Sequence, residues 1–238
     1  MICFLTSSTT VADANVLNPK NDFIEELRQR FPDSCRALFI CSDPDQHEIT
    51  DLYASAMKSS FEEAGFEFEN FNVLDNRNHL LATQLINESS LIILAGGHVP
   101  TQNKFFDKIH LKEMIQGFSG VLIGISAGSM NSADMVYAQP ELSGETLDPS
   151  FQRFLKGLGL TKIMLLPHYE TLKHDSLDGL RVIEDITFSD SVGHTFHLIP
   201  DGSYLFIKDG IEELRGEAYV VKDAKLTQIA KHGERVLL

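Results

Sequence analysis

Short apolar runs alternate with longer amphipathic stretches through the first half of the chain. Runs at about residues 2–7, 37–41, 91–95 and 121–123 have the length and apolar content of buried strands, and residues 66–73 alternate apolar and polar, which predicts a strand with one face less buried. Helical patterns separate them at about residues 18–31, 48–64, 77–88 and 101–117. Because parallel strands need crossovers of this length, the alternation predicts an α/β fold with a doubly wound, mostly parallel sheet flanked by helices.

The pattern changes in the second half of the chain. Residues 138–159 are rich in proline and glycine and predict irregular structure, whereas residues 164–166 predict a short strand and 175–186 a helix. Short strands separated by turn residues then predict C-terminal β-hairpins at 196–199, 204–208, 213–214 and 218–222. No repeat or linker divides the sequence, so we expect one α/β domain over residues 1–238.

Charge and composition exclude several classes of partner. The net charge of −14 comes without a basic stripe, which argues against nucleic acid and anionic membrane surfaces as partners. The first residues lack the basic region and long apolar run of a signal peptide, and no apolar run is long enough to span a bilayer. Cys3, Cys35 and Cys41 lack metal-type spacing and indicate buried thiols in a reducing compartment, so we expect a cytoplasmic protein.

One serine lies where a predicted strand meets a run of small residues. Gly124-Ile125-Ser126-Ala127-Gly128 follows the strand 121–123 and precedes residues that can begin a helix. A strand, a sharp turn and a helix form the context of a nucleophile elbow, in which the serine Oγ projects from a rigid strand. We therefore identify Ser126 as a candidate nucleophile and the Ala127 N–H as an oxyanion donor. A plain turn with a buried serine is the alternative.

A serine nucleophile needs a base within hydrogen-bond reach. Among nine histidines, His168 is the best placed, because it follows the strand 164–166 and would project from the same end of the sheet as Ser126. A structural histidine is the alternative at this position. His194 and His197 would point to opposite faces of a strand and make a poor metal pair.

Two further turns supply the remaining candidates. Asp201 follows the strand 196–199 and could orient the base, although Asp-Gly is a common turn pair and the residues alone favour a plain turn. Its rivals are Asp175, Asp178 and Asp190. The loop Ala95-Gly96-Gly97-His98 follows the strand before the elbow, and its Gly97 N–H could supply a second oxyanion donor.

Four motifs now stand in a fixed order: Ala95-Gly96-Gly97-His98, Gly124-Ile125-Ser126-Ala127-Gly128, Leu166-Pro167-His168-Tyr169 and Ile199-Pro200-Asp201-Gly202. Their order and spacing resemble those of the serine peptidase family that contains dipeptidase E and the cyanophycinases. The resemblance implies a sheet like that of class I glutamine amidotransferases and a triad of Ser126, His168 and Asp201. It also implies that the Gly97 and Ala127 amides form the oxyanion hole.

Two departures from dipeptidase E affect the expected substrate. His98 stands where that enzyme has asparagine in the oxyanion loop. After the catalytic histidine, that enzyme has a Gly-Glu-Thr-Arg stretch whose basic side chain suits an aspartyl substrate, whereas the comparable stretch here is His174-Asp175-Ser176-Leu177 and the next arginine is Arg181. We therefore expect an enzyme that is not strictly aspartyl-specific.

These observations together predict a serine peptidase that hydrolyses a small peptide or a peptide-like amide through an acyl-enzyme. We expect no metal and no organic cofactor. An esterase or amidase on the same triad is one alternative, and a catalytically silent protein that binds a small ligand is another.

Overall fold

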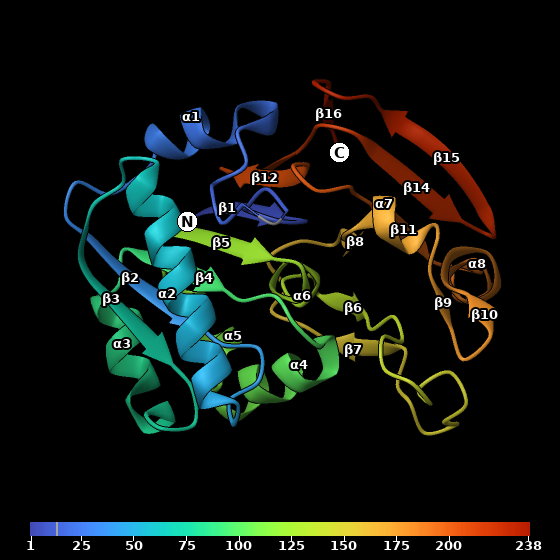
Figure 1. The fold of residues 1–238 in the computed structure, drawn as a ribbon, viewed down its shortest axis with the longest axis horizontal. Helices are drawn as coiled ribbons and strands as arrows, with labels where there is room; N and C mark the ends of the chain where they lie inside the picture. The colour runs from blue at the N-terminus through green and yellow to red at the C-terminus, as the bar shows by residue number, and fades with distance from the viewer. Residues whose placement is uncertain (13) are drawn as a thin grey trace.

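The structure, a computed structural model, describes residues 1–12 and 14–238 (Figure 1). Its large sheet contains β1 (Ile2–Thr6), β2 (Cys35–Ile40), β3 (Phe68–Leu74), β4 (Leu91–Leu94), β5 (Val121–Ile125), β12 (Tyr204–Lys208), β13 (Ile211–Arg215) and β16 (Arg235–Leu237). A second sheet contains β8 (Met164–Leu166), β11 (Thr195–Leu198), β14 (Ala218–Lys222) and β15 (Lys225–Ala230). Two small pairs join β6 (Met135–Tyr137) to β7 (Phe154–Lys156), and β9 (Ser176–Leu177) to β10 (Leu180–Arg181).

The helices connect these strands. They are α1 (Phe23–Arg28), α2 (His47–Glu63), α3 (Ala82–Glu88), α4 (Val99–Lys108), α5 (Leu111–Ile115), α6 (Ala127–Met130), α7 (Tyr169–Leu172) and α8 (Phe188–Asp190). Three short turns of other helix types, η1 (Lys20–Asp22), η2 (His79–Leu81) and η3 (Val182–Thr187), complete the set.

The large sheet has the order β16-β13-β12-β1-β5-β4-β2-β3. Its strands from β1 to β3 in this order are all parallel, which confirms the predicted doubly wound sheet. The C-terminal strand β12 runs antiparallel to β1 and begins the predicted hairpin with β13. The carboxyl ends of the parallel strands therefore meet at one edge, where open α/β sheets bind their ligands.

Successive residues of the central strands point to opposite faces of the sheet. Phe4 packs in one hydrophobic cluster with α1 and α2, whereas Leu5 packs in another with α3, α4 and α5. Figure 1 shows the helices on the two sides of the sheet, with α2 crossing in front of it. Because both faces are covered, the central strands β4 and β5 are apolar throughout, whereas β3 at the edge of the sheet alternates apolar and polar residues.

The second sheet lies beside the carboxyl edge of the first (Figure 1). Its strands β8 and β11 are parallel neighbours, β14 lies antiparallel to β11, and β14 forms a hairpin with β15, a strand that the sequence analysis did not predict. Leu165 of β8 and Ala218 of β14 belong to the same hydrophobic cluster as Leu5 and Leu205 of the large sheet. The two sheets therefore share a core.

Several predicted helices are interrupted in the structure. The helix expected at 175–186 is wrong in its first half, because Asp178 and Gly179 adopt positive φ and turn the chain between β9 and β10. His110 has φ of 55° and divides the helix expected at 101–117 into α4 and α5. Asn21 and Asp22 likewise have positive φ before α1. Asn, Asp and His accept this conformation more readily than other non-glycine residues.

All three cysteines are free and buried, as predicted. Burial raises the pKa of the Cys3 and Cys35 thiols to about 12, so both are protonated near neutral pH. Within the part of the chain that the structure describes, no helix combines the length and apolarity needed to cross a membrane.

Candidate active site

Ser126 lies in a sharp turn between β5 and α6. Its backbone has φ of 48° and ψ of −111°, a conformation that costs a non-glycine residue about 1–3 kcal/mol. Its N–H donates to the Thr6 carbonyl (3.1 Å), which fixes the turn to the end of β1. A Cβ at Gly128 would lie 2.4 Å from the Leu94 carbonyl, so only glycine allows α6 to pass this close to β4. The elbow predicted around Ser126 is present.

His168 and Asp201 come from the second sheet. His168 follows β8 and Asp201 follows β11, and these two strands are parallel neighbours. The prediction that strand 164–166 shares a sheet with Ser126 is therefore wrong, because β8 pairs with β11 and not with a strand of the large sheet. The docking of the two sheets nevertheless brings the carboxyl ends of β5, β8 and β11 together.

A continuous chain of hydrogen bonds links the three predicted residues. His168 Nε2 lies 2.9 Å from Ser126 Oγ. On the other side of the ring, His168 Nδ1 lies 2.8 Å from Asp201 Oδ1. With Nδ1–H donated to the carboxylate, Nε2 has a lone pair directed at the serine hydroxyl, which is the arrangement that general-base catalysis requires.

Two further side chains support this arrangement, and the sequence analysis did not identify either. Ser7, at the end of β1, donates its hydroxyl to Asp201 Oδ1 (2.6 Å) and accepts the His168 backbone N–H (2.9 Å). Glu170 Oε1 accepts the backbone N–H of Asp201 (2.9 Å). Ser7 belongs to a polar run that follows the first parallel strand, and this position at the carboxyl edge is the signal that could have indicated it.

The surroundings of His168 favour its protonated form. Burial alone lowers the pKa of His168, but the hydrogen bond and charge of Asp201 and the charges of Glu170 and Glu141 outweigh burial. The net result is a pKa of His168 above its ordinary value. An imidazolium that forms during a reaction is therefore stabilised at this position.

The surroundings of Asp201 favour its ionised form. Burial raises the pKa of Asp201, but hydrogen bonds to His168 and Ser7 and the charges of His168 and Lys20 lower it by more. The pKa of Asp201 therefore lies below the ordinary value of a carboxyl group. Asp201 is an anion near neutral pH and can hold the imidazole ring in one tautomer.

The two predicted oxyanion donors flank Ser126. Ala127 follows it directly, and Gly97 lies in the loop after β4, where the neighbouring Gly96 Cβ position would be 3.3 Å from Ser126 Cβ. Gly97 has φ of 146°, and a Cβ there would lie 2.3 Å from Ser42 Oγ, so the loop needs glycine. Within the described residues, neither the Gly97 nor the Ala127 amide donates to another protein group. Both amides are therefore free to bind a developing oxyanion.

His98, which departs from the dipeptidase E pattern, has a structural partner. Its Nε2 lies 2.9 Å from Glu145 Oε1, and its Nδ1 lies 2.8 Å from Thr101 Oγ1. Glu145 in turn accepts the N–H groups of Glu141 and Leu142. His98 therefore ties the loop that contains Glu145 to the start of α4, beside the oxyanion loop.

The rival residues are engaged elsewhere or unsuited to the task. The Asp178 carboxylate accepts the Gly144 N–H (2.9 Å), and Asp190 accepts the Tyr137 hydroxyl (2.8 Å). Burial lowers the pKa of His197 to about 4, and its buried Nδ1 has no hydrogen-bond partner in the described part of the chain. No group of three His, Cys, Asp or Glu side chains suited to a metal ion occurs in residues 1–12 and 14–238.

The comparisons with known proteins agree with this fold. A peptidase from an acI-B1 Actinobacterium has a TM-score of 0.61 at 17% sequence identity, over 100% of this chain and 96% of that one. A protein from Listeria monocytogenes EGD-e, described as a candidate peptidase E, has a TM-score of 0.53 at 18% identity, over 96% of this chain and 98% of that one. At these identities the likeness is one of fold. No curated protein sequence matches the chain.

A family profile extends the likeness from fold to family. The profile of peptidase family S51 matches residues 3–214, which is nearly the whole chain. The resemblance noted from the four motifs is therefore confirmed. The chain belongs to peptidase family S51, the serine-type peptidases that include dipeptidase E and the cyanophycinases.

Proposed function

We propose that this peptidase hydrolyses the amide bond of a small peptide with Ser126 as nucleophile, His168 as general base and Asp201 as the residue that orients the base. The observation that supports this proposal most directly is the hydrogen-bond chain from Ser126 Oγ through the His168 ring to Asp201 Oδ1, with distances of 2.9 and 2.8 Å. Cys41 and Ser126 line one cavity, but burial raises the pKa of the Cys41 thiol, so this thiol is protonated and a poor nucleophile.

The reaction would begin when Ser126 Oγ attacks the substrate carbonyl and His168 Nε2 accepts the hydroxyl proton. The amides of Gly97 and Ala127 would donate to the oxyanion of the tetrahedral intermediate. His168 would then give its proton to the departing amine, which leaves an acyl-enzyme on Ser126. A water molecule, activated by His168, would hydrolyse the acyl-enzyme and restore the free serine.

The available cations argue against strict aspartyl specificity. A substrate carboxylate in a closed pocket needs a matching cation, because removing the partner of a buried charge costs about 3–5 kcal/mol. Arg181 is paired with Asp185 through two hydrogen bonds of 2.7 and 2.9 Å. Lys173 Nζ lies over the Tyr169 ring, 5.7 Å from its centre. We therefore propose that the enzyme accepts a neutral or basic residue at the cleaved bond.

Labelling with a fluorophosphonate probe tests this proposal. The probe should modify Ser126 in the wild type, and Ser126→Ala should abolish both labelling and dipeptide hydrolysis, with a loss of roughly three or more orders of magnitude in rate. An unlabelled wild-type protein would indicate a silent ligand-binding homologue. A protein that is labelled and cleaves nitrophenyl esters but no dipeptide would indicate an esterase on the same triad.

A further inference from the structure

A cavity of about 600 Å³ opens beside Ser126. It extends from Ser126, His168 and Gly97 to the first half of α2. A substrate whose carbonyl lies at Ser126 therefore has a neighbouring side chain within reach of this cavity. The inference below rests on the proposed role of Ser126 and concerns which side chain the cavity selects.

The wall that α2 contributes is apolar and open to solvent. Ile49 and Tyr53, four residues apart on one face of the helix, are 50% and 64% exposed, and both line the cavity. Met57, one turn further, continues the same wall, and its Sδ accepts the Thr9 hydroxyl. Apolar side chains at the mouth of a cavity gain most when a ligand covers them.

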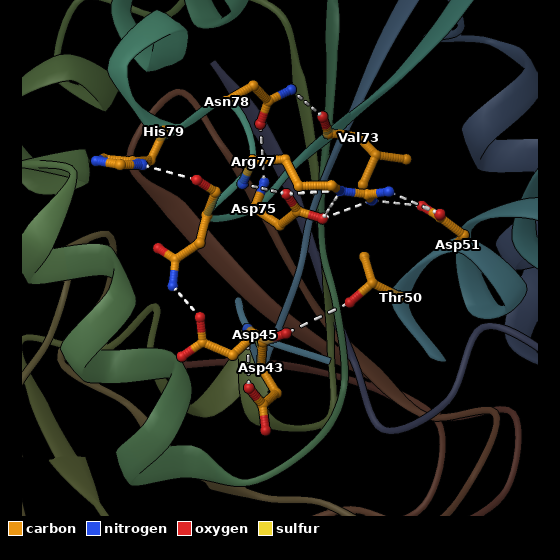
Figure 2. Close-up of polar contacts among 10 residues, drawn as sticks. Asp43, Asp45, Thr50, Asp51, Val73, Asp75, Arg77, Asn78 and His79 are labelled. Atoms are coloured by element: carbon orange, nitrogen blue, oxygen red, sulfur yellow. Dashed lines mark hydrogen bonds and ion pairs between the residues drawn. The ribbon is translucent and has the colours of Figure 1, made fainter. Parts of the chain in front are cut away.

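Packing holds α2 in place before any ligand binds, because its Ala54 and Phe61 are buried in the hydrophobic cluster that contains Phe4, and polar contacts add to this packing. Figure 2 shows Arg77 between two carboxylates: it donates to Asp51 of α2 (2.8 and 2.5 Å) and to Asp75, which follows β3 (2.9 and 2.6 Å). Thr50 Oγ1 also donates to the Asp43 carbonyl (3.4 Å). The helix that forms the wall is thus fixed to the carboxyl ends of β2 and β3, and a preformed wall loses little freedom on binding.

The charge of the cavity does not favour acidic side chains. Asp43 lines it, and no lysine or arginine does so in the described part of the chain. The Asp43 carboxylate accepts the Asp45 N–H (3.2 Å), as Figure 2 shows, and remains partly open to solvent. A cationic substrate side chain could pair with Asp43, but an ion pair that is exposed to water contributes little to binding. By contrast, each methylene buried in an apolar pocket changes kcat/KM about tenfold or more. Apolar contacts should therefore determine the preference more than the charge of Asp43 does.

We propose that this cavity is the specificity subsite and that it selects a large apolar side chain, such as leucine, methionine or phenylalanine, next to the scissile amide. Ile49 and Tyr53 form its apolar wall. Aspartate and glutamate are disfavoured, because no lysine or arginine in the described lining pairs with a carboxylate and Asp43 adds repulsion.

Two series of dipeptides test the proposal, one that varies the first residue and one that varies the second. The series that varies the residue bound in the cavity should show the preference. In that series, kcat/KM for the leucine and phenylalanine dipeptides should exceed that for the alanine dipeptide by about tenfold or more, and the aspartate dipeptide should be the poorest substrate. Tyr53→Ala should reduce the ratio of phenylalanine to alanine in that series. Leu52→Ala is the matched control, because Leu52 is 68% exposed on the same helix and does not line the cavity; it should leave the ratio unchanged.

Asp43→Asn supplies a second test, and it should raise the ratio of kcat/KM for the aspartate dipeptide to that for the leucine dipeptide. The inference is overturned if both series favour lysine, arginine or aspartate over leucine, or if Tyr53→Ala leaves the ratio of phenylalanine to alanine as in the wild type. Fluorophosphonate labelling distinguishes a failure of the proposed subsite from a failure of the proposed nucleophile. A labelled enzyme without apolar preference contradicts only the subsite, whereas an unlabelled one contradicts the proposed nucleophile.

Discussion

At the scale of single residues, the contact with Asp201 raises the pKa of His168 and favours its protonated form. The base must be neutral to accept the serine proton, so kcat/KM should fall as the pH drops through the pKa of His168. That pKa lies above the ordinary value of about 6.5, because Asp201 and neighbouring carboxylates outweigh the opposite effect of burial. We expect the acidic limb of the wild-type pH profile to lie correspondingly high.

Asp201→Asn should move this limb to lower pH and reduce kcat by about four orders of magnitude, since an amide favours the wrong imidazole tautomer. Rate profiles of both proteins against pH make the comparison, and circular dichroism controls for folding. A limb that stays at the wild-type position would mean that Asp201 does not act on His168.

Ser7 is expected to act through Asp201 and not on the substrate. Its hydroxyl donates to Asp201 Oδ1 at 2.6 Å, and a hydrogen bond to a charged group contributes about 1.5–3 kcal/mol. Ser7→Ala should therefore lower kcat about tenfold or more with little change in KM, and Ser7→Thr should restore part of the loss. Ser8→Ala is the control, because the Ser8 hydroxyl bonds the Thr10 carbonyl instead. A large rise in KM for Ser7→Ala would contradict a positioning role.

The sequence predicted only some of the residues that lie together at the site. Ser126, His168 and Asp201 follow recognisable strand and turn motifs, and the structure brings them together. Ser7 carries no such motif, because its contact with His168 depends on how the second sheet docks against β1. Long-range placement of this kind leaves no trace in local residue patterns.

At the scale of elements, a buried ion cluster fastens β13 to α1. Arg215 is 5% exposed, donates to Glu26 of α1 (2.8 Å) and to Glu213 (2.5 Å), and lies over the Phe206 ring. Arg215→Met would fill a similar volume, but the carboxylates of Glu26 and Glu213 would both lose the cation that they share. Glu26 would still be paired with Arg30 in this variant. We therefore expect the free energy of unfolding to fall by about 3 kcal/mol, the low end of the range measured when one partner of a buried ion pair is removed.

Urea denaturation measures this loss, and Arg181→Met provides the control. Arg181 pairs with Asp185 on the surface and is 62% exposed, so its replacement should change stability little. Equal effects of the two substitutions would show that the Arg215 cluster does not stabilise the fold.

The strands were predictable because burial on both faces of the sheet leaves continuous apolar runs, as in β4 and β5. The ends of the helices were harder to predict from the sequence. Whether His110 continues a helix or adopts positive φ is decided by the packing of α4 against α5, and the periodicity of residues 101–117 does not distinguish the two.

At the scale of the whole molecule, the net charge of −14 acts on every charged substrate. Repulsion should slow the association of anionic peptides, and salt screens this effect over a Debye length of about 8 Å at physiological ionic strength. We expect kcat/KM for an acidic dipeptide to rise with added NaCl, while that for a neutral dipeptide of similar size stays nearly constant. Parallel responses of the two substrates would show that the overall field plays no part in association.

The division of the site between two sheets has a consequence for biosynthesis. During translation the serine leaves the ribosome 42 residues before its histidine, and the histidine 33 residues before its aspartate. The strand that pairs with β1 on its other side, β12, is made later still. A nascent chain therefore contains the serine before its proposed base, and we expect chains that stop before residue 164 to be inert toward fluorophosphonates. On this prediction, the order of the chain keeps the proposed base away from the serine until synthesis is nearly finished.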